Sequence, residues 1–419
     1  MCATFYASLR ESVVVNVTPS SSNAIGHQLD TASFEDNFEW LCRQVPKLAL
    51  ASETPQQPEW HGEGSVYNHL RMVFAEAREL TAELSDDGRH IVLLASLLHD
   101  VGKTWCTRPR EDAAGRIQLV SPRHAGEGAQ HLQLLWDDTA LPVAWRDAVL
   151  SLVAYHHHPA RLVNAFNPWL LAFVTRHIPG KWLYLLELAD LRGRIAADKS
   201  TALERLEIFK LFCEEHDCYE RSSNMNQRLK DVMGDDTAED TRLLTRQMLL
   251  RGTFLDPAQG AACFHAPTSQ RLVMMCGLAG SGKSTQAASL AQALGAVIIA
   301  PDDFRTRDDA KARSDAWRKA LQALKHALGQ GQSVVYDACN VRQDYRNNIE
   351  RIAAAYNVPL GVVPVMTSPR EAIAHNRQRS GLERVPDDVI VRQFESFERI
   401  DLTRYAFWNA EEVVASMRS

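Results

Sequence analysis

The sequence predicts two domains, an all-helical domain followed by an α/β domain built on a parallel sheet. The 419 residues are enough for two domains of ordinary size. Over most of 36–265 apolar residues recur at three- and four-residue spacing, which predicts amphipathic helices. From 266 to 419 short apolar runs alternate with helical patterns, as in βαβ units. Residues 1–35 are polar and lack periodicity, so we predict an N-terminal tail or leading segment there.

The composition is that of a globular protein in the cytoplasm. Hydrophobic residues make up 45% of the chain and charged residues 23%. The sequence contains neither a long uninterrupted apolar segment nor the basic start and apolar core of a secretory signal, so we expect no membrane partner. The 8 cysteines form no CxxC pair, which argues against a disulfide framework or a zinc knuckle.

The charge is distributed unevenly between the two predicted domains. The chain carries a formal net charge of −6, yet residues 271–419 hold 20 Lys and Arg against 17 Asp and Glu. A weakly basic domain can bind a strand end through a few placed arginines, without a basic coat. The charge therefore disfavours binding along a long duplex and leaves a nucleic-acid end possible as a partner.

The first domain is predicted to consist of helices with one short hairpin. Apolar spacing predicts helices over 67–84, 89–98, 145–155, 183–192 and 202–214. Residues 112–120 are predicted to form a hairpin. A further helix is expected over 242–250, and with 202–214 it either completes the first domain or packs between the two. Pro and Gly punctuate 252–270, which predicts a linker.

Histidines and aspartates recur along the predicted helices of the first domain. The ordered set is His69, His99, Asp100, His124, His156 and Asp190. Imidazole and carboxylate groups together suit Mn, Fe, Co, Ni or Zn. Divalent ions lower the pKa of water and neutralise phosphate oxygens. The set therefore predicts a site for one or two such ions and the hydrolysis of a phosphoester.

Single residues of this set carry less information than their order. The adjacent pair His99 and Asp100 can place two ligands on one ion, or Asp100 can bridge two ions. Lys103, about one turn later, is a candidate to contact the phosphate. An isolated histidine such as His61 is more often a helix cap or a surface residue, and at most two of the consecutive histidines at 156–158 can face one site.

Residues 37–200 resemble the HD phosphohydrolases, because the histidines and aspartates of the ordered set follow the sequence pattern of that family. The resemblance implies that all six residues of the ordered set are metal ligands. The presence of both His124 and His156 implies a two-metal site. The family's Tyr-His-x-x-Pro pattern fits Tyr155 to Pro159 with His156 as the ligand and His157 as its neighbour.

The second domain opens with a phosphate-binding motif, GLAGSGKS, which fits GxxxxGK[ST], follows an apolar strand and begins a helix. In this context backbone N–H groups and the helix N-terminus hold phosphate oxygens. Lys283 is expected to neutralise the β- and γ-phosphates and Ser284 to bind Mg²⁺. The predicted cofactor is therefore ATP or another NTP with Mg²⁺. The predicted nucleotide-binding residues are Gly277, Gly280, Ser281, Gly282, Lys283, Ser284 and Thr285.

Polar residues follow two of the four predicted strands, which cover 271–276, 296–300, 333–336 and 360–365. Asp302 and Arg305 follow the second strand, and Asp337 and Asn340 follow the third. Strand ends in an open parallel sheet face the ligand crevice. Asp302 can accept the proton of an attacking hydroxyl there, and Arg305 can hold a phosphate. The alternatives are a helix N-cap for Asp302 and a strand-end cap for Asp337.

Arginines gather after the predicted helix that ends near 376. Arg377, Arg379 and Arg384 can close over the phosphates as a lid and stabilise charge in the transition state. The alternative is that these arginines only complement the dipole of the helix end.

Residues 271–400 resemble phage-type polynucleotide 5′-kinases, which share the P-loop, a D-D-[FY]-R after the second strand, a D-x-x-N after the third, an arginine lid and a V-P-x-D-V helix start. The resemblance implies that Asp302 is the general base on a 5′-hydroxyl, that Arg305 contacts the neighbouring phosphate, and that Asp337 and Asn340 bind the acceptor. It also implies that Arg379 is the lid arginine. The catalytic residues expected in the whole chain are Lys103, Lys283, Asp302 and Arg379.

This sequence departs from the kinase pattern at two places in the lid. One extra residue separates Arg379 from Gly381, and His375 stands where the family often has a basic residue just before the lid asparagine. The assignment of Arg379 therefore depends on the fold of the lid more than the assignment of Asp302 does.

The order of the two domains resembles the bacterial HD-Pnk family of bifunctional end-healing enzymes. The resemblance implies that the first domain removes phosphate from 2′,3′-cyclic, 2′- or 3′-phosphate ends and that the second restores a 5′-phosphate. The implied partners are RNA or DNA strand ends, a nucleotide, and an RNA ligase of the same pathway. Two rival functions remain open, a small-molecule P-loop kinase fused to an HD phosphohydrolase and a nucleotide-gated HD regulator without end-healing activity.

Overall fold

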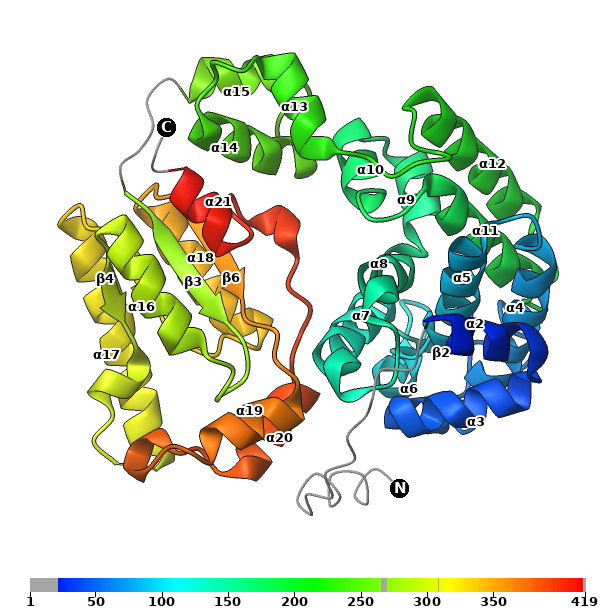
Figure 1. Ribbon diagram of the computed structural model, residues 1–419, viewed down its shortest axis with the longest axis horizontal. Helices are drawn as coiled ribbons and strands as arrows, with labels where there is room; N and C mark the ends of the chain where they lie inside the picture. Colours follow the sequence, from blue (N-terminus) through cyan, green and yellow to red (C-terminus); the bar gives the residue numbers. More distant parts are fainter. Residues whose placement is uncertain (1–21, 265–269, 308, 417–419) are drawn as a thin grey trace. The chain divides into compact units, whose positions relative to one another are not determined.

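The computed structural model describes residues 22–264, 270–307 and 309–416 (Figure 1). By its contacts the chain divides into two compact units, Met1–Met225 and Asn226–Ser419. Within the described residues no helix combines the length and the apolar character needed to cross a membrane.

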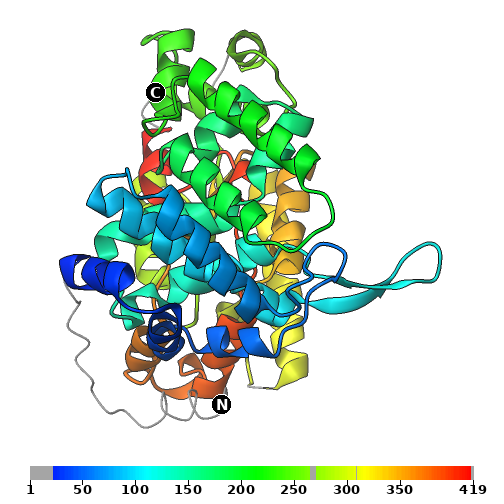
Figure 2. The same ribbon diagram turned by 90° about the vertical axis from the view of Figure 1, so that its right-hand side faces the viewer.

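The first unit is helical apart from one hairpin. Its α-helices are α2 (Ser22–Thr31), α3 (Phe34–Gln44), α4 (Val66–Leu80), α5 (Asp86–Leu98), α6 (Lys103–Cys106), α7 (His124–Leu135), α8 (Arg146–Tyr155), α9 (His158–Asn164), α10 (Pro168–Val174), α11 (Gly180–Arg192) and α12 (Ser200–Glu215). Strand β1 (Arg108–Glu111) pairs antiparallel with β2 (Ile117–Val120). Figure 2 shows this hairpin extending away from the helices of its unit, which confirms the hairpin expected near 112–120.

Helix α5 forms the centre of the first unit. All of its residues from His90 to Leu98 are buried, and α4, α8 and α11 pack against it. A helix that is apolar all round belongs in a core. Helix α5 therefore ends inside the helical bundle, and the two residues that follow it are His99 and Asp100.

The expected leading segment 1–35 is structured from Ser22 onward. Helix α2 packs against α5, with Ile25 and Leu29 buried. The Asp30 carboxylate accepts a hydrogen bond from Arg89 Nε at 2.7 Å. The polar composition predicted a tail, but two buried apolar residues four positions apart are enough to attach one helix to a core. Residues 1–21 lie outside the described residues.

The second unit contains a four-stranded parallel sheet, which confirms the predicted fold class (Figure 1). The strands are β3 (Leu272–Cys276), β4 (Val297–Ile299), β5 (Val334–Tyr336) and β6 (Leu360–Pro364), in the order β4-β5-β3-β6. The α-helices from β3 onward are α16 (Lys283–Leu294), α17 (Ala310–Gly329), α18 (Gln343–Ala355), α19 (Pro369–Asn376), α20 (Asp387–Glu395) and α21 (Ala410–Ala415). The loops after β3, β4 and β5 meet at one edge of the sheet, where parallel sheets bind ligands.

Three helices that precede β3 complete the second unit, namely α13 (Met225–Met233), α14 (Glu239–Leu250) and α15 (Pro257–Cys263). Leu243 and Leu244 of α14 join the core that covers β3 and β5. Arg246, which is 1% exposed, forms an ion pair with Glu412 at 2.7 Å.

The border between the units therefore differs from the expected one at 265. Residues 226–264 belong with the sheet, and the predicted linker 252–270 contains α15. Amphipathic spacing predicts that one face of a helix is buried, but it does not indicate against which of the two domains that face packs. The contacts of α14 decide this point.

Candidate active sites

Six residues from five places in the fold converge inside the first unit. They lie on α4, just after α5, at the start of α7, just after α8 and on α11, and they are His69, His99, Asp100, His124, His156 and Asp190. Each is at most 7% exposed. We call these six residues, together with His157, the histidine centre.

One group of ligand atoms in the histidine centre surrounds Nε2 of His69. This atom lies 2.9 Å from Asp190 Oδ1 and 3.5 Å from Asp100 Oδ2. His99 Nε2 lies 3.5 Å from the same Asp100 oxygen and 3.9 Å from the same Asp190 oxygen. Two imidazole nitrogens and two carboxylate oxygens are therefore placed to share one ion.

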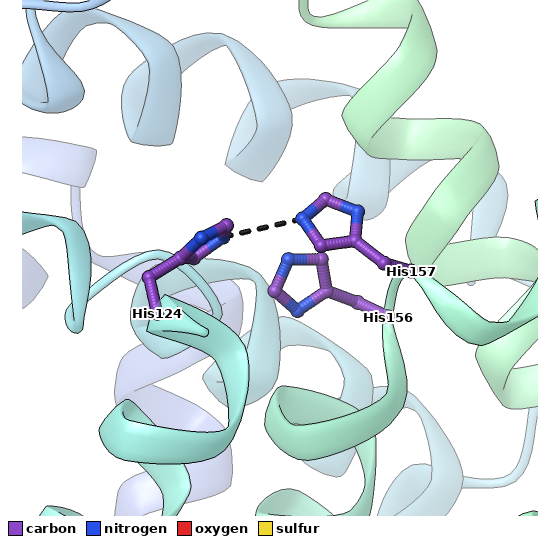
Figure 3. A group of neighbouring side chains, drawn as sticks. All are labelled: His124, His156 and His157. Carbon is purple, nitrogen blue, oxygen red and sulfur yellow. Dashed lines mark hydrogen bonds between the residues drawn. The ribbon is translucent and has the colours of Figure 1, made fainter. Parts of the chain in front are cut away.

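A second group lies on the other oxygen of Asp100. Asp100 Oδ1 is 3.0 Å from His124 Nε2 and 3.8 Å from His156 Nε2. His157 joins this group, with its Nε2 at 3.2 Å from His124 Nε2 (Figure 3). Because the two oxygens of Asp100 face different groups, Asp100 lies where a carboxylate can bridge two ions. The sequence had placed His157 beside the site as a neighbour of the ligand.

Three of the histidines are oriented by the same local contact. In His99, His124 and His156, Nδ1 faces the backbone carbonyl three residues earlier in the chain. The carbonyls are those of Ser96, Ser121 and Val153, at 3.0, 2.7 and 2.9 Å. A carbonyl oxygen only accepts, so Nδ1 carries the hydrogen and Nε2 presents its lone pair to the centre.

The fourth ring, His69, is oriented by a carboxylate. Glu63 Oε1 lies 2.9 Å from His69 Nδ1 and 2.8 Å from His61 Nδ1. The Ile195 N–H donates to Glu63 Oε2 at 2.9 Å. Burial raises the pKa of the Glu63 carboxyl, but these three contacts outweigh burial and hold that pKa well below its ordinary value. A carboxylate behind a metal-binding histidine fixes the ring and raises its basicity.

Glu63 and His61 are functional candidates that the sequence left unassigned. Glu63 lies in a loop six residues before His69, and no spacing rule connects a loop carboxylate to a ring on the next helix. His61, expected as a cap or a surface residue, is 9% exposed and contacts Glu63.

The polar atoms of the histidine centre fit a divalent cation. Within the part of the chain that the structure describes, Nε2 of His99 and Nε2 of His156 are buried without a hydrogen-bond partner. Each such buried polar atom costs about 1–3 kcal/mol unless something else satisfies it. Lone pairs and anionic oxygens that point at one another are satisfied by a cation, and mixed nitrogen and oxygen donors suit a transition metal.

Two cations hold the carboxylates of the centre in place. Lys103 Nζ lies 2.7 Å from Asp100 Oδ2 and donates to Gln56 Oε1 at 2.7 Å. Arg194 Nε donates to Asp190 Oδ1 at 2.9 Å. Burial raises the pKa of the Asp100 carboxyl, but Lys103 and the nearby histidines hold that pKa well below its ordinary value. Lys103 thus orients a ligand in this structure, and its contact with a phosphate stays a prediction.

In the second unit the P-loop connects β3 to α16. Gly280 and Gly282 have φ of 84° and 90°, in the left-handed region that favours glycine. A Cβ at Gly280 would lie 2.2 Å from the Ala372 carbonyl oxygen, so only glycine fits there. Lys283 is 6% exposed, and its Nζ donates to the Leu278 carbonyl at 2.5 Å. The backbone conformation of the loop therefore depends on glycine at these positions.

A cavity of about 750 Å³ opens over the P-loop. We call it the P-loop cavity. The sequence-predicted residues on its wall are Gly280, Lys283, Ser284, Asp302, Arg305, Asp337, Arg379 and Arg384. The further charged residues on its wall are Asp303, Arg313, Glu383 and Arg392. Basic groups thus outnumber acidic ones on the wall, which suits ligands that carry several phosphates. The other predicted nucleotide-binding residues do not line the cavity, and they are Gly277, Ser281, Gly282 and Thr285.

Asp302 and Asp337 reach the P-loop cavity from neighbouring strands. Asp302 lies on a 3-10 helix, η4 (Pro301–Phe304), one residue after its first position rather than at its cap. Its side chain is 81% exposed, and Oδ1 is 3.5 Å from Nη1 of Arg305. Asp337 directly follows β5 and is half-buried. Both carboxylates can therefore meet a hydroxyl brought to the loop.

Asn340 differs from the other predicted acceptor residues. It is 5% exposed and has φ of 46°. Its side-chain Nδ2 donates to the Met275 carbonyl at 2.8 Å, and its backbone carbonyl accepts from Arg346 Nη1 at 2.9 Å. It does not line the P-loop cavity. In this structure the Asn340 side chain anchors the loop after β5 to β3.

The arginines near 376 lie in the segment between α19 and α20, residues 377–386, which we call the lid segment. Asn376 is fully buried and holds both ends of the segment together. Its Nδ2 donates to the Val385 carbonyl at 2.6 Å, and its Oδ1 accepts from the Val385 N–H at 3.0 Å. Arg377 pairs with Asp387 at 2.9 Å, whereas Arg379 lines the P-loop cavity. Of these two arginines, only Arg377, at the end of α19, fits the alternative that an arginine complements the dipole of a helix end.

Comparisons with known proteins agree with this division of the chain. Residues 66–184 match the HD domain family, and residues 272–400 match an AAA domain family. Among solved structures, a gluconokinase from Sinorhizobium meliloti 1021 is 20% identical over 36% of this chain and 94% of that chain, with a TM-score of 0.27. No curated protein matches the chain. The matched families, the helical unit and the parallel sheet establish that the chain joins an HD domain to a P-loop kinase-like domain.

Proposed function

We propose that the protein is a bifunctional end-healing enzyme of nucleic acids, and of RNA in particular. Its kinase domain transfers the γ-phosphate of ATP to a polynucleotide 5′-hydroxyl. Its HD domain hydrolyses 2′,3′-cyclic phosphates and 2′- or 3′-phosphates at strand ends. The observation that carries the proposal is the P-loop cavity, in which two carboxylates for a hydroxyl are surrounded by an excess of arginines. Such a wall suits an acceptor that itself carries phosphates.

The kinase reaction follows from the positions of these groups. The P-loop N–H groups and Lys283 hold the triphosphate, and the Ser284 hydroxyl is placed to bind its Mg²⁺. Asp302 accepts the proton of the 5′-hydroxyl as its oxygen attacks the γ-phosphorus. A bond from that oxygen to phosphorus forms, the bond to the β,γ-bridging oxygen breaks, and ADP leaves. Arg379, on the cavity wall, is placed to offset the charge that develops.

Arg305 and Asp337 position the acceptor. Arg305 is only 11% exposed at its side chain, so its guanidinium is held by the surrounding chain rather than free in solvent. A guanidinium held in this way can grip a phosphate in two-point contact. Asp337 can accept a second hydrogen bond from the sugar. The phosphate contact of Arg305 favours a nucleotide acceptor over a neutral sugar.

The HD reaction depends on the ligand set of the histidine centre. His69, His99 and Asp190 would hold one ion, and His124, His156 and His157 would hold a second, with Asp100 within reach of both groups. Bound divalent ions supply an activated nucleophile and neutralise phosphate oxygens. Glu63, Lys103 and Arg194 hold the ligands in place. The oxygen of a water molecule forms a bond to phosphorus, the bond from phosphorus to a ribose oxygen of the strand end breaks, and the ribose oxygen leaves as a hydroxyl with the proton that the water loses.

Two variants test whether the chain carries both activities. Asp302→Ala should abolish 5′-phosphorylation and spare phosphate release, and Asp100→Ala should do the reverse. Matched controls are Asp315→Ala on α17 and Asp147→Ala on α8, whose side chains are 42% and 66% exposed. Both controls should retain both activities.

The assays use 5′-hydroxyl oligonucleotides of RNA and DNA with ATP, and RNA ends that carry a 2′,3′-cyclic or a 2′-phosphate. No phosphate transfer to either oligonucleotide would overturn the kinase half of the proposal, and transfer to gluconate or another small hydroxyl compound instead would favour a small-molecule kinase. Purified protein without a transition metal and without phosphate release would overturn the HD half.

A further inference from the structure

A second, smaller cavity of about 380 Å³ adjoins the P-loop cavity within the second unit. The two cavities share wall residues from the loop after β5 and from α20. The shared residues are Ala338, Cys339, Val389, Arg392 and Gln393. Because Ala338 directly follows Asp337, the smaller cavity begins beside the carboxylate that we assign to the acceptor. A ligand bound at Asp337 can therefore extend into it.

The wall of the smaller cavity carries two aromatic rings, and we call it the aromatic pocket. Trp317 of α17 and Tyr345 of α18 have ring centroids 6.4 Å apart and planes inclined by 56°. Tyr345 is 43% exposed, and Trp317 is half-buried. Aromatic rings that line a cavity and remain open to solvent offer a flat apolar surface to a planar ligand.

Basic groups lie at the same pocket. The Arg342 guanidinium lies 5.9 Å from the centroid of the Tyr345 ring, and Arg342 also pairs with Asp344 at 3.0 Å. Arg392, which lines both cavities, pairs with Asp388 at 2.6 Å. The combination of stacking surfaces and arginines is typical of sites for single-stranded nucleic acid.

We propose that the aromatic pocket binds the terminal nucleobase of the acceptor strand, the base of the nucleoside whose 5′-hydroxyl is phosphorylated. This inference rests on the proposed kinase function and names the part of the substrate that the pocket recognises. The volume suits one nucleoside-sized group and not a run of bases. Stacking tolerates any sequence because every base has a flat face, so the pocket should favour strand ends without reading their sequence.

The position of the pocket favours the acceptor over the adenine of ATP. The triphosphate would bind at the P-loop, and the aromatic pocket meets the P-loop cavity at Ala338, directly after Asp337. Asp337 belongs to the acceptor side of the transfer in our assignment. The pocket therefore begins beside the carboxylate that we assign to the acceptor, and we place the acceptor nucleoside there.

The test removes each partner of the stacking contact in turn. The protein variants are Trp317→Ala and Tyr345→Ala, with Trp317→Phe and Tyr345→Phe as conservative forms that keep a ring. The substrates are a 5′-hydroxyl oligonucleotide, the same strand with an abasic first nucleotide, and the same strand with an abasic second nucleotide. The matched control is Tyr356→Ala, because Tyr356 is 39% exposed at the opposite end of α18 and does not line the pocket.

The alanine variants should raise the acceptor KM by about tenfold or more and leave kcat and the KM for ATP nearly unchanged. The phenylalanine variants should restore most of the affinity. On wild-type protein the abasic first nucleotide should raise KM by a similar factor, and the alanine variants should add little to that effect. An abasic second nucleotide should have a much smaller effect.

Several results would overturn the inference. If the acceptor KM is unchanged in both alanine variants and with the abasic first nucleotide, the inference is wrong and the proposed kinase function stands. A rise in the KM for ATP would assign the pocket to the donor base, and a larger effect of the abasic second nucleotide would assign it to the next base. Failure of wild-type protein to phosphorylate any oligonucleotide would instead overturn the proposed function, and this inference with it. The abasic substrates keep the test valid if an alanine variant does not fold.

Discussion

In the histidine centre every sequence-predicted ligand is at most 7% exposed, whereas in the P-loop cavity the predicted general base, Asp302, is 81% exposed. The ligand rings are each held by a second contact, such as that from His99 Nδ1 to the Ser96 carbonyl. Asp302, by contrast, has one ion pair, to Arg305 at 3.5 Å. The histidine centre is enclosed by packed helices, whereas Asp302 is open to solvent.

The difference follows from what each site must hold. A small ion requires several donor atoms at fixed distances, and helices that pack in a core provide that precision. A kinase must admit two large substrates and release two products, so its charged groups lie on loops at an open sheet edge. The predictions below test this comparison, from the largest expected effect to the smallest.

Metal removal should separate the two sites most sharply. Treatment with a strong chelator, followed by dialysis into buffer with Mg²⁺, should reduce phosphate release by about a thousandfold or more and leave 5′-phosphorylation unchanged. Release should return when Mn, Co, Ni or Zn ions are added. Metal analysis beside both assays checks this, and full phosphate release from metal-free protein would contradict a metal-dependent histidine centre.

Arg379→Ala should lower kcat of the kinase by about a hundred- to a thousandfold, because a lid arginine offsets charge that develops only in the transition state. The matched control is Arg377→Ala. Arg377 lies two residues away and pairs with Asp387, so its loss should change kcat by only a few-fold. Steady-state kinetics on a 5′-hydroxyl oligonucleotide distinguish the two, and equal effects would remove the special role of Arg379.

Glu63→Gln should weaken metal binding by about ten- to a hundredfold, because the variant loses the negative charge behind His69 and keeps the shape of the side chain. Phosphate release should fall at limiting metal and recover at excess metal. Glu59→Gln, at an exposed position of the same loop, is the control. Titration with Co or Zn measures the affinity, and an unchanged affinity would reduce Glu63 to a structural residue.

Asn376→Ala should have the smallest effect. The variant loses the two hydrogen bonds that hold Val385 to the end of α19, which frees the lid segment. We expect kcat of the kinase to fall by about three- to tenfold, since each hydrogen bond is worth about 1 kcal/mol. Faster proteolysis within 377–386 should accompany the loss. Unchanged kinetics with faster proteolysis would mean that lid order does not limit the reaction.

Much of the fold follows from the sequence because its local signals are strong. The helix predicted over 89–98 is α5, Asp86–Leu98, and the strand predicted over 360–365 is β6, Leu360–Pro364. The GxxxxGK[ST] motif lies between β3 and α16 as expected. These predictions succeed because apolar periodicity and glycine geometry act over a few neighbouring residues.

The parts that the sequence did not provide are contacts between different elements of the fold. Glu63 reaches His69 from a loop, and His157 joins His124 from another helix end. Helix α14 packs with the sheet of the second unit, although its pattern fits either core. Asn340 bonds the backbone of β3 instead of facing the P-loop cavity.

The sequence by itself determined the two fold classes, the residue types of both sites and the order in which they occur. The tertiary structure decided which atoms meet. It set the two oxygens of Asp100 against two groups of histidines, and it placed the aromatic pocket beside Asp337. The physical reason is that periodicity and motifs report on neighbours along the chain, whereas a site is made by side chains that only packing brings together.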